Sequence, residues 1–132
     1  MQSYLFIGGG MDSLNIPAIF LFVAGFPLWL LGIRAFDHLV LLECTRHADA
    51  WKADGEPHPY FFKGGYKWRR SLGTDFASQR RYLVWLFRTP EWSLSDPEAA
   101  RYLRRLRLLA GLWNLVFIPI FLGTIFFTLR PG

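Results

Sequence analysis

Two uncharged apolar segments, one near each end of the chain, constrain what this sequence can fold into. Residues 14–33 read LNIPAIFLFVAGFPLWLLGI and residues 108–128 read LLAGLWNLVFIPIFLGTIFFT, and neither contains Asp, Glu, Lys, Arg or His. At about 1.5 Å of rise per residue, each segment would form a helix of about 30 Å, the thickness of the hydrocarbon core of a bilayer. The 132-residue chain has no large domain in which to bury such helices. We therefore expect two transmembrane helices.

The charges between these segments set the expected orientation. Residues 46–107 hold thirteen Lys or Arg and seven Asp or Glu, residues 1–13 hold no Lys or Arg, and Arg130 alone follows the second segment. Because Lys and Arg near span ends stay on the cytoplasmic side, both termini should lie outside. The expected division of the chain is an N-terminal tail 1–13, a span 14–33, a cytoplasmic part 34–107, a span 108–128 and a C-terminal tail 129–132.

The first segment lacks the flanks of a signal peptide. No basic residue precedes it and no small-residue cleavage site follows it. We therefore expect it to remain in the protein, with Met11 as an alternative start of the chain.

Helix-breaking residues and capping signals define the expected helices. The first should continue from its span until Asp54-Gly55, and the second should start with a Ser95 and Glu98 capping box and end near Leu129. Residues 74–89 predict a short amphipathic helix, either flat on the inner leaflet or packed on the two long helices. The expected fold class is an all-α membrane protein, with two antiparallel transmembrane helices that extend into the cytoplasm and a basic, aromatic-rich loop between them.

Basic side chains gather where the second span begins and in the loop. We expect these side chains, together with that of Trp68, to contact anionic lipid headgroups of the inner leaflet or a protein partner; the residues are Arg101, Arg104, Arg105, Arg107, Lys67, Trp68, Arg69, Arg70, Arg80 and Arg81. Basic and aromatic residues together also suit single-stranded nucleic acid, but the spans would hold this loop at a bilayer, so we expect no nucleic-acid partner. Asp37 lies at the depth of Arg104 and Arg105, and an ion pair with either is the alternative partner for these arginines.

Small and polar residues form a stripe along each span. The first stripe repeats every seven residues, and the second alternates steps of four and three; their members are Ala18, Gly25 and Gly32, and Ala110, Asn114, Phe117, Phe121, Thr124 and Thr128. Since helices in lipid associate through close packing and a few hydrogen bonds, we expect these stripes to face each other or a helix of a partner.

Residues suited to catalysis or metal binding are few. Glu43, Cys44 and His47 are close in sequence, but a metal site needs three or four converging ligands, and His38 and His58 lie elsewhere in the chain. No nucleophile has an identifiable base, and no glycine-rich segment has the phosphate-loop pattern. We expect no enzyme activity, no cofactor and no metal.

Two arginine-rich segments carry a family resemblance. RYLVWLFR at residues 81–88 and RYLRRLRLL at residues 101–109 resemble the universal stress protein B family, small bacterial inner-membrane proteins with a span near each end and a basic middle. The resemblance covers the C-terminal half, implies a bacterial inner-membrane location and a stress-related role, and carries no active site. The residues themselves favour a non-enzymatic accessory subunit that packs against and stabilises a larger membrane complex. A freestanding stress-related membrane protein is the alternative.

Overall fold

The computed structural model describes residues 16, 19–64, 68 and 72–129, and helices joined by loops, without a strand, make up this described part. The elements are, in order, the π-helix η1 (Leu21–Gly25), α2 (Phe26–Arg46), α3 (Ala48–Ala53), α4 (Leu72–Phe87), α5 (Glu91–Leu94) and α6 (Pro97–Leu129). The first and last of the long helices, Phe22–Arg46 and Pro97–Leu129, are long and apolar enough to cross a membrane. The prediction of an all-α chain with two such helices is therefore confirmed. The tail 1–13 with Met11, and the residues Ala18, Lys67, Arg69 and Arg70, lie outside the described residues.

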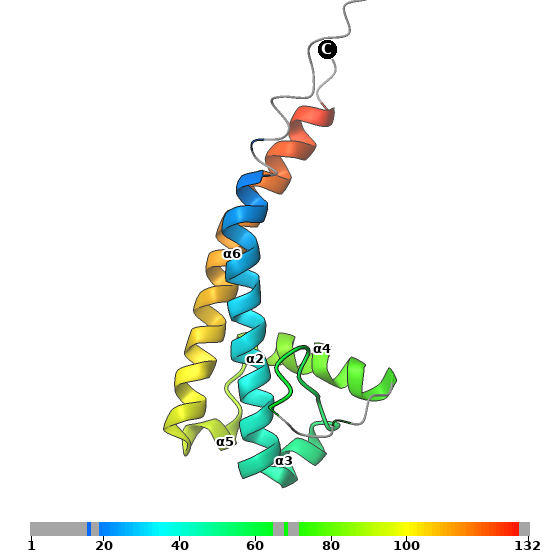
Figure 1. Cartoon of the computed structure of the whole chain (residues 1–132), viewed down its shortest axis with the longest axis vertical. Helices are drawn as coiled ribbons and strands as arrows, with labels where there is room; N and C mark the ends of the chain where they lie inside the picture. The colour runs from blue at the N-terminus through cyan, green and yellow to red at the C-terminus, as the bar shows by residue number, and fades with distance from the viewer. Residues whose placement is uncertain (1–15, 17–18, 65–67, 69–71, 130–132) are drawn as a thin grey trace, which may run out of the picture.

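The two long helices lie side by side and run in opposite directions (Figure 1). At one end, Arg46 of α2 pairs with Asp96 and Glu98 of α6, at 3.1 Å from Nη1 to Oδ2 and 2.7 Å from Nη2 to Oε2. At the other end, Gly25 lies against the ring of Trp113. Beyond Trp113, α6 continues for about sixteen residues, passing through Pro119 without a break.

Asp96 caps α6 at its N-terminus. Its Oδ1 accepts hydrogen bonds from the backbone N–H groups of Glu98 and Ala99, at 3.0 and 3.2 Å. The Ser95 hydroxyl instead donates to the carbonyl of Trp92, at 3.1 Å. The predicted capping box is therefore wrong by one residue. The Asp96 carboxylate is the cap because it accepts these N–H groups and also lies beside the guanidinium of Arg46.

The first long helix ends earlier than its sequence predicts. His47 has φ −131° and ψ 50°, which breaks the helix after Arg46, and α3 leaves the line of α2 (Figure 1). The ring of His47 packs against that of Trp92 with a centroid distance of 5.0 Å. The predicted stop at Gly55 ends α3 instead, and Gly55 adopts a φ of +85°, in the left-handed region that favours glycine.

We call the described residues from 34 to 107 the base, and its core lies where α4 crosses the two long helices (Figure 1). Phe36 of α2 is 0% exposed, and its ring centroid lies 5.4 Å from the centroids of Tyr60, Tyr82 and Trp85. Residues of both long helices complete this cluster; they are Ala35, Leu39, Val40, Leu42, Ala99, Leu103 and Leu106. Packing of α4 on the long helices, one of the two predicted alternatives, is thus present in the structure.

The loop after α3 is fixed between α4 and α2. The imidazole Nε2 of His58 pairs with the Asp75 carboxylate of α4, and the backbone N–H of His58 donates to the Ser78 hydroxyl at 2.8 Å. His58 and Ser78 are both buried. These bonds place residues 60–62 directly against α2, where they form one side of the base.

Candidate interfacial site between α2 and α6

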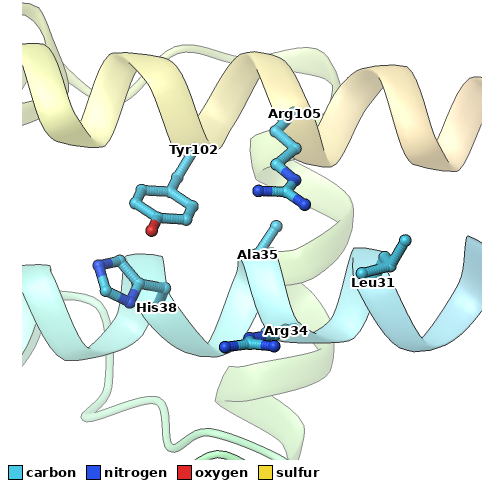
Figure 2. Close-up of a pocket in the computed structure, with 6 residues that line it drawn as sticks. All are labelled: Leu31, Arg34, Ala35, His38, Tyr102 and Arg105. Atoms are coloured by element: carbon cyan, nitrogen blue, oxygen red, sulfur yellow. The ribbon is translucent and has the colours of Figure 1, made fainter.

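A pocket of about 320 Å³ opens between the two long helices, where the base adjoins their apolar halves. Four of its lining residues come from α2 at helical spacing and two come from α6, so each set lies on one helix face. Figure 2 shows these six side chains, with Tyr102 and Arg105 extending from α6 toward α2; the six are Leu31, Arg34, Ala35, His38, Tyr102 and Arg105. The two helices together build a site that neither could form alone.

Two arginines give the pocket its positive charge. Arg105 extends from α6 toward α2 (Figure 2), and the guanidinium of Arg34 lies over the ring of Phe62 at 5.4 Å. Neither arginine forms an ion pair or a hydrogen bond with another residue that the structure describes. The pocket therefore holds two cationic groups without an acidic partner, an arrangement that attracts an anion.

A network of side chains positions the other wall of the pocket. The rings of His38 and Tyr102 pack with a centroid distance of 4.0 Å and an interplanar angle of 30°. His38 Nε2 lies 3.3 Å from Oε1 of Glu98, and Oε2 of Glu98 accepts a hydrogen bond from Arg46. That bond from Arg46 lowers the pKa of Glu98, so Glu98 stays ionised and holds the His38 ring in place.

The four arginines before the second apolar segment have three different environments. Arg101 and Arg104 are exposed, and the guanidinium of Arg101 lies over the neighbouring ring of Tyr102 at 5.4 Å. Arg105 lines the pocket. The cluster predicted from the sequence thus contributes one side chain to the pocket and two to the open surface of α6.

Arg107 has a structural role that its sequence position does not indicate. Its Nε donates to the backbone carbonyl of Trp85 at 2.9 Å, and its Nη2 donates to the Thr89 hydroxyl at 3.2 Å. Trp85 lies in the last turn of α4, where carbonyl groups lack partners within the helix. Arg107 therefore caps α4 and holds it on α6.

The predicted contact residues of the loop and of α4 are also divided. Arg80 is exposed, whereas Arg81 forms an ion pair with Asp54 inside the base. Trp68 donates its indole N–H to the carbonyl of Lys63 at 2.8 Å. Of these three, Arg80 alone is oriented for contact with lipid or with another protein.

Asp37 does not pair with Arg104 or with Arg105, and this prediction is wrong. Asp37 is completely buried, and its carboxylate accepts three consecutive backbone N–H groups from residues 60–62. The distances are 2.6 Å to Oδ1 for residue 60 and 2.9 Å to Oδ2 for both residues 61 and 62. The bonds of His58 to Asp75 and Ser78 hold this loop against α4, and the loop backbone, instead of an arginine of α6, fills the acceptor sites of Asp37.

The glycines of the first stripe lie against α6. A Cβ atom added at Gly25 would lie 2.2 Å from Cζ3 of Trp113, and one added at Gly32 would lie 3.9 Å from Cβ of Leu109. Ala110 of the second stripe is buried. Close approach of the two helices at Gly25 therefore requires a residue without a side chain.

The remainder of the second stripe bonds to its own helix. Asn114 donates to the carbonyl of Ala110 at 2.8 Å, and Thr128 donates to that of Thr124 at 2.8 Å. The Thr124 hydroxyl likewise donates to a carbonyl of its helix, and the rings of Phe117 and Phe121 stack at 5.6 Å. Asn114, Phe121, Thr124 and Thr128 are exposed, so this part of the stripe faces away from the other described helices.

A buried carboxyl group lies in the base, ten residues beyond the apolar segment 14–33. Glu43 is 0% exposed, and neither of its carboxyl oxygens has a hydrogen-bond partner among the described residues. Burial, with a smaller contribution from the nearby Asp54 carboxylate, raises the pKa of Glu43 to about 9, against the opposing effect of the Arg81 guanidinium. Glu43 is therefore neutral at pH 7. The described residues, Glu43 among them, contain no cluster of three side chains able to hold a metal ion.

The stability of the protein should fall as the pH rises from about 4.5 to about 9. In this range Glu43 is ionised in the unfolded chain but protonated in the folded protein, so unfolding releases a proton and a higher pH favours it. The slope of the free energy of unfolding against pH approaches about 1.4 kcal/mol per pH unit. Above about pH 9 the stability contributed by the protonated Glu43 is lost. Denaturant unfolding in detergent at several pH values measures it. Glu43→Gln should flatten the curve, and an unchanged slope in that variant would contradict the assignment.

Two features of the structure were not predicted from the sequence: the pocket and the role of Arg107. The spacing of residues 31, 34, 35 and 38 was the available signal for the pocket, because it places them on one helix face. Comparisons with protein families, with curated proteins and with solved structures find no match to this chain.

Proposed function

We propose that this protein is a non-enzymatic accessory subunit of a larger membrane protein complex in the bacterial inner membrane. Its two long helices cross the bilayer antiparallel, both termini lie outside, and the base lies in the cytoplasm against the partner complex. The uncovered apolar half of α6 supports the placement of the long helices in a bilayer. Leu115 is 72% exposed, and the large apolar side chains around it on this half-helix are exposed as well; they are Leu112, Ile118, Phe121, Leu122, Ile125, Phe126, Phe127 and Leu129.

Lipid accounts for most of this apolar surface. Exposure of apolar area to water costs about 25 cal/mol per Å², and a continuous apolar half-helix without charge is what a bilayer accommodates. The basic residues of 46–107 favour the cytoplasm for the base, because Lys and Arg near span ends remain on that side.

The outer face of the base supports a protein partner. Some of its charged side chains pair with each other, as Arg46 does with Asp96 and Arg81 with Asp54. Several large apolar side chains of the base are exposed; those on α4 and α5 are Phe76, Leu83, Phe87 and Leu94. A group of exposed large apolar residues on a small domain is typical of an interaction surface.

A freestanding stress-related membrane protein is the second candidate function. The segments 81–88 and 101–109, which resemble the universal stress protein B family, are in direct contact, because Arg107 bonds to the carbonyl of Trp85. The two segments that carry the resemblance thus lie together in the base, and a kinship through them would not require a partner complex.

Mild detergent extraction followed by a native gel and affinity purification tests the first proposal. We expect the tagged full chain to migrate far above its monomer mass of 15.4 kDa and to retain other membrane proteins. The double variant Phe76→Glu and Phe87→Glu should release them, while Gln79→Glu, an exposed change on the same helix, should not. Migration as a bare monomer or a small homo-oligomer would instead support the freestanding protein, and recovery in the aqueous fraction would exclude both.

A further inference from the structure

We propose that the pocket between α2 and α6 binds the phosphate group of an anionic glycerophospholipid from the inner leaflet. This inference deepens the proposed function and rests on it, because it requires the two long helices to be embedded in a bilayer. It assigns a ligand class to a site built from both helices, whereas Arg101 and Arg104, which lie outside the pocket, would contact headgroups without selecting among them.

Unpaired charge is the first argument. Arg46, Arg81 and Arg107 each pair with a carboxylate or donate to a carbonyl inside the base, but Arg34 and Arg105 bond to none of the residues that the structure describes. An arginine guanidinium donates two parallel hydrogen bonds to phosphate oxygens. Arg34 lines the pocket from α2 and Arg105 lines it from α6, so a phosphate bound there would meet cationic side chains of both helices.

Depth in the membrane is the second argument. Arg34 directly follows the apolar segment 14–33, and Arg105 comes three residues before the segment 108–128. The pocket is therefore at the level where a bilayer places its phosphates. Basic pockets between transmembrane helices on the cytoplasmic side are typical lipid-headgroup sites.

The order of side chains along the pocket is the third argument and favours lipid over free phosphate. Leu31 lies on the side of the apolar segments, Arg34 and Arg105 lie in the middle, and His38 and Tyr102 lie on the side of the base (Figure 2). This spatial order of apolar, cationic and polar side chains matches the order of acyl chain, phosphate and glycerol headgroup in a lipid. The Tyr102 hydroxyl, which bonds to none of the described residues, is available to a headgroup oxygen.

The size of the pocket agrees with a headgroup and not with a whole lipid. Its volume of about 320 Å³ is at the lower end of the range of small-molecule sites, roughly 300–1,000 Å³. The acyl chains would lie outside it, along the exposed apolar surface of α6. Glu98 and Arg46 hold His38 in position from the base side, so the pocket needs little rearrangement to bind.

Lipid binding to the purified full chain in neutral detergent tests the inference. Phosphatidylglycerol is titrated and the bound lipid counted by native mass spectrometry, with phosphatidylcholine and inorganic phosphate as comparison ligands. We expect phosphatidylglycerol to bind at least about tenfold more tightly than phosphatidylcholine, and Arg34→Gln with Arg105→Gln to weaken it by about ten- to a hundredfold. Arg101→Gln with Arg104→Gln removes the same charge from positions outside the pocket and should change binding by less than about threefold.

Further variants separate the possible failures. Arg105→Gln alone, at an exposed position, should weaken phosphatidylglycerol by about tenfold even if the double variant folds poorly. Leu31→Gln should weaken the binding of phosphatidylglycerol but leave the binding of inorganic phosphate unchanged. Equal losses from both arginine pairs would reject the pocket in favour of diffuse attraction, and equal binding of inorganic phosphate and lipid would reject the lipid assignment. Either failure in a protein that still fractionates with membranes leaves the proposed function standing, whereas recovery in the aqueous fraction ends both.

Discussion

Replacement of Asp37 by Ala is expected to lower the free energy of unfolding by about 3–5 kcal/mol. The Asp37 carboxylate is fully buried and accepts the backbone N–H groups of residues 60, 61 and 62 at 2.6–2.9 Å. Alanine would leave three N–H donors without an acceptor in a part-buried place, and hydrogen bonds to a charged group contribute more than neutral ones. Denaturant unfolding of the full chain in detergent, followed by tryptophan fluorescence, measures the loss.

Two control variants make this result specific. Asp49→Ala removes a carboxylate from an exposed position at the start of α3, and it should change the free energy of unfolding by less than about 1 kcal/mol. Arg104→Gln should change it by less than about 0.5 kcal/mol, because this arginine does not pair with Asp37. Wild-type stability in Asp37→Ala would show that the loop does not depend on this carboxylate. A large loss of stability in Arg104→Gln would support the ion pair between Asp37 and Arg104 after all.

Asp37 also connects the loop with the candidate site. The N–H groups that it holds belong to residues 60–62, and the ring of Phe62 lies under the guanidinium of Arg34 at 5.4 Å. Asp37 and Arg34 are neighbours on α2, separated by one turn, so the loop that Asp37 fixes in turn supports the side chain that lines the pocket. Asp37→Ala should therefore release Phe62 from Arg34 as well as destabilise the base.

Local sequence signals predicted the long helices well. The absence of charge over about twenty residues, the prolines and the glycines act within a few positions of the chain, and the two membrane-length helices follow from them. Gly55 ends a helix as expected, because a left-handed φ there favours a residue without a side chain.

The break at His47 and the partner of Asp37 could not be predicted in this way. No glycine or proline stands at His47, and its environment is made by Trp92 and Asp96, which lie more than forty residues away. The partners of Asp37 are backbone groups, which every residue carries, so no residue type indicates them. The pocket shares this difficulty, since it exists only after α2 and α6 pack together and fix the register of Arg34 and Arg105.

Replacement of Phe36 by Ala is expected to lower the free energy of unfolding by about 3–5 kcal/mol, because it removes a completely buried ring from the centre of the base. Three aromatic rings, those of Tyr60, Tyr82 and Trp85, lie around it at equal centroid distances of 5.4 Å. They come from the loop and from α4, so the cavity would loosen both from α2. Denaturant unfolding measures the loss, and the emission of the buried Trp85 should shift to longer wavelength.

Phe76→Ala is the matched control, since it removes the same side chain from α4 at a site that is 69% exposed. It should change the free energy of unfolding by less than about 0.5 kcal/mol, because this ring leaves no cavity when it is lost. Equal effects of the two substitutions would mean that α4 does not pack on α2 through Phe36. In that case α4 would be free to lie flat on the inner leaflet, and the apolar face that Phe76 shares with Phe87 would be explained by lipid instead of a partner protein.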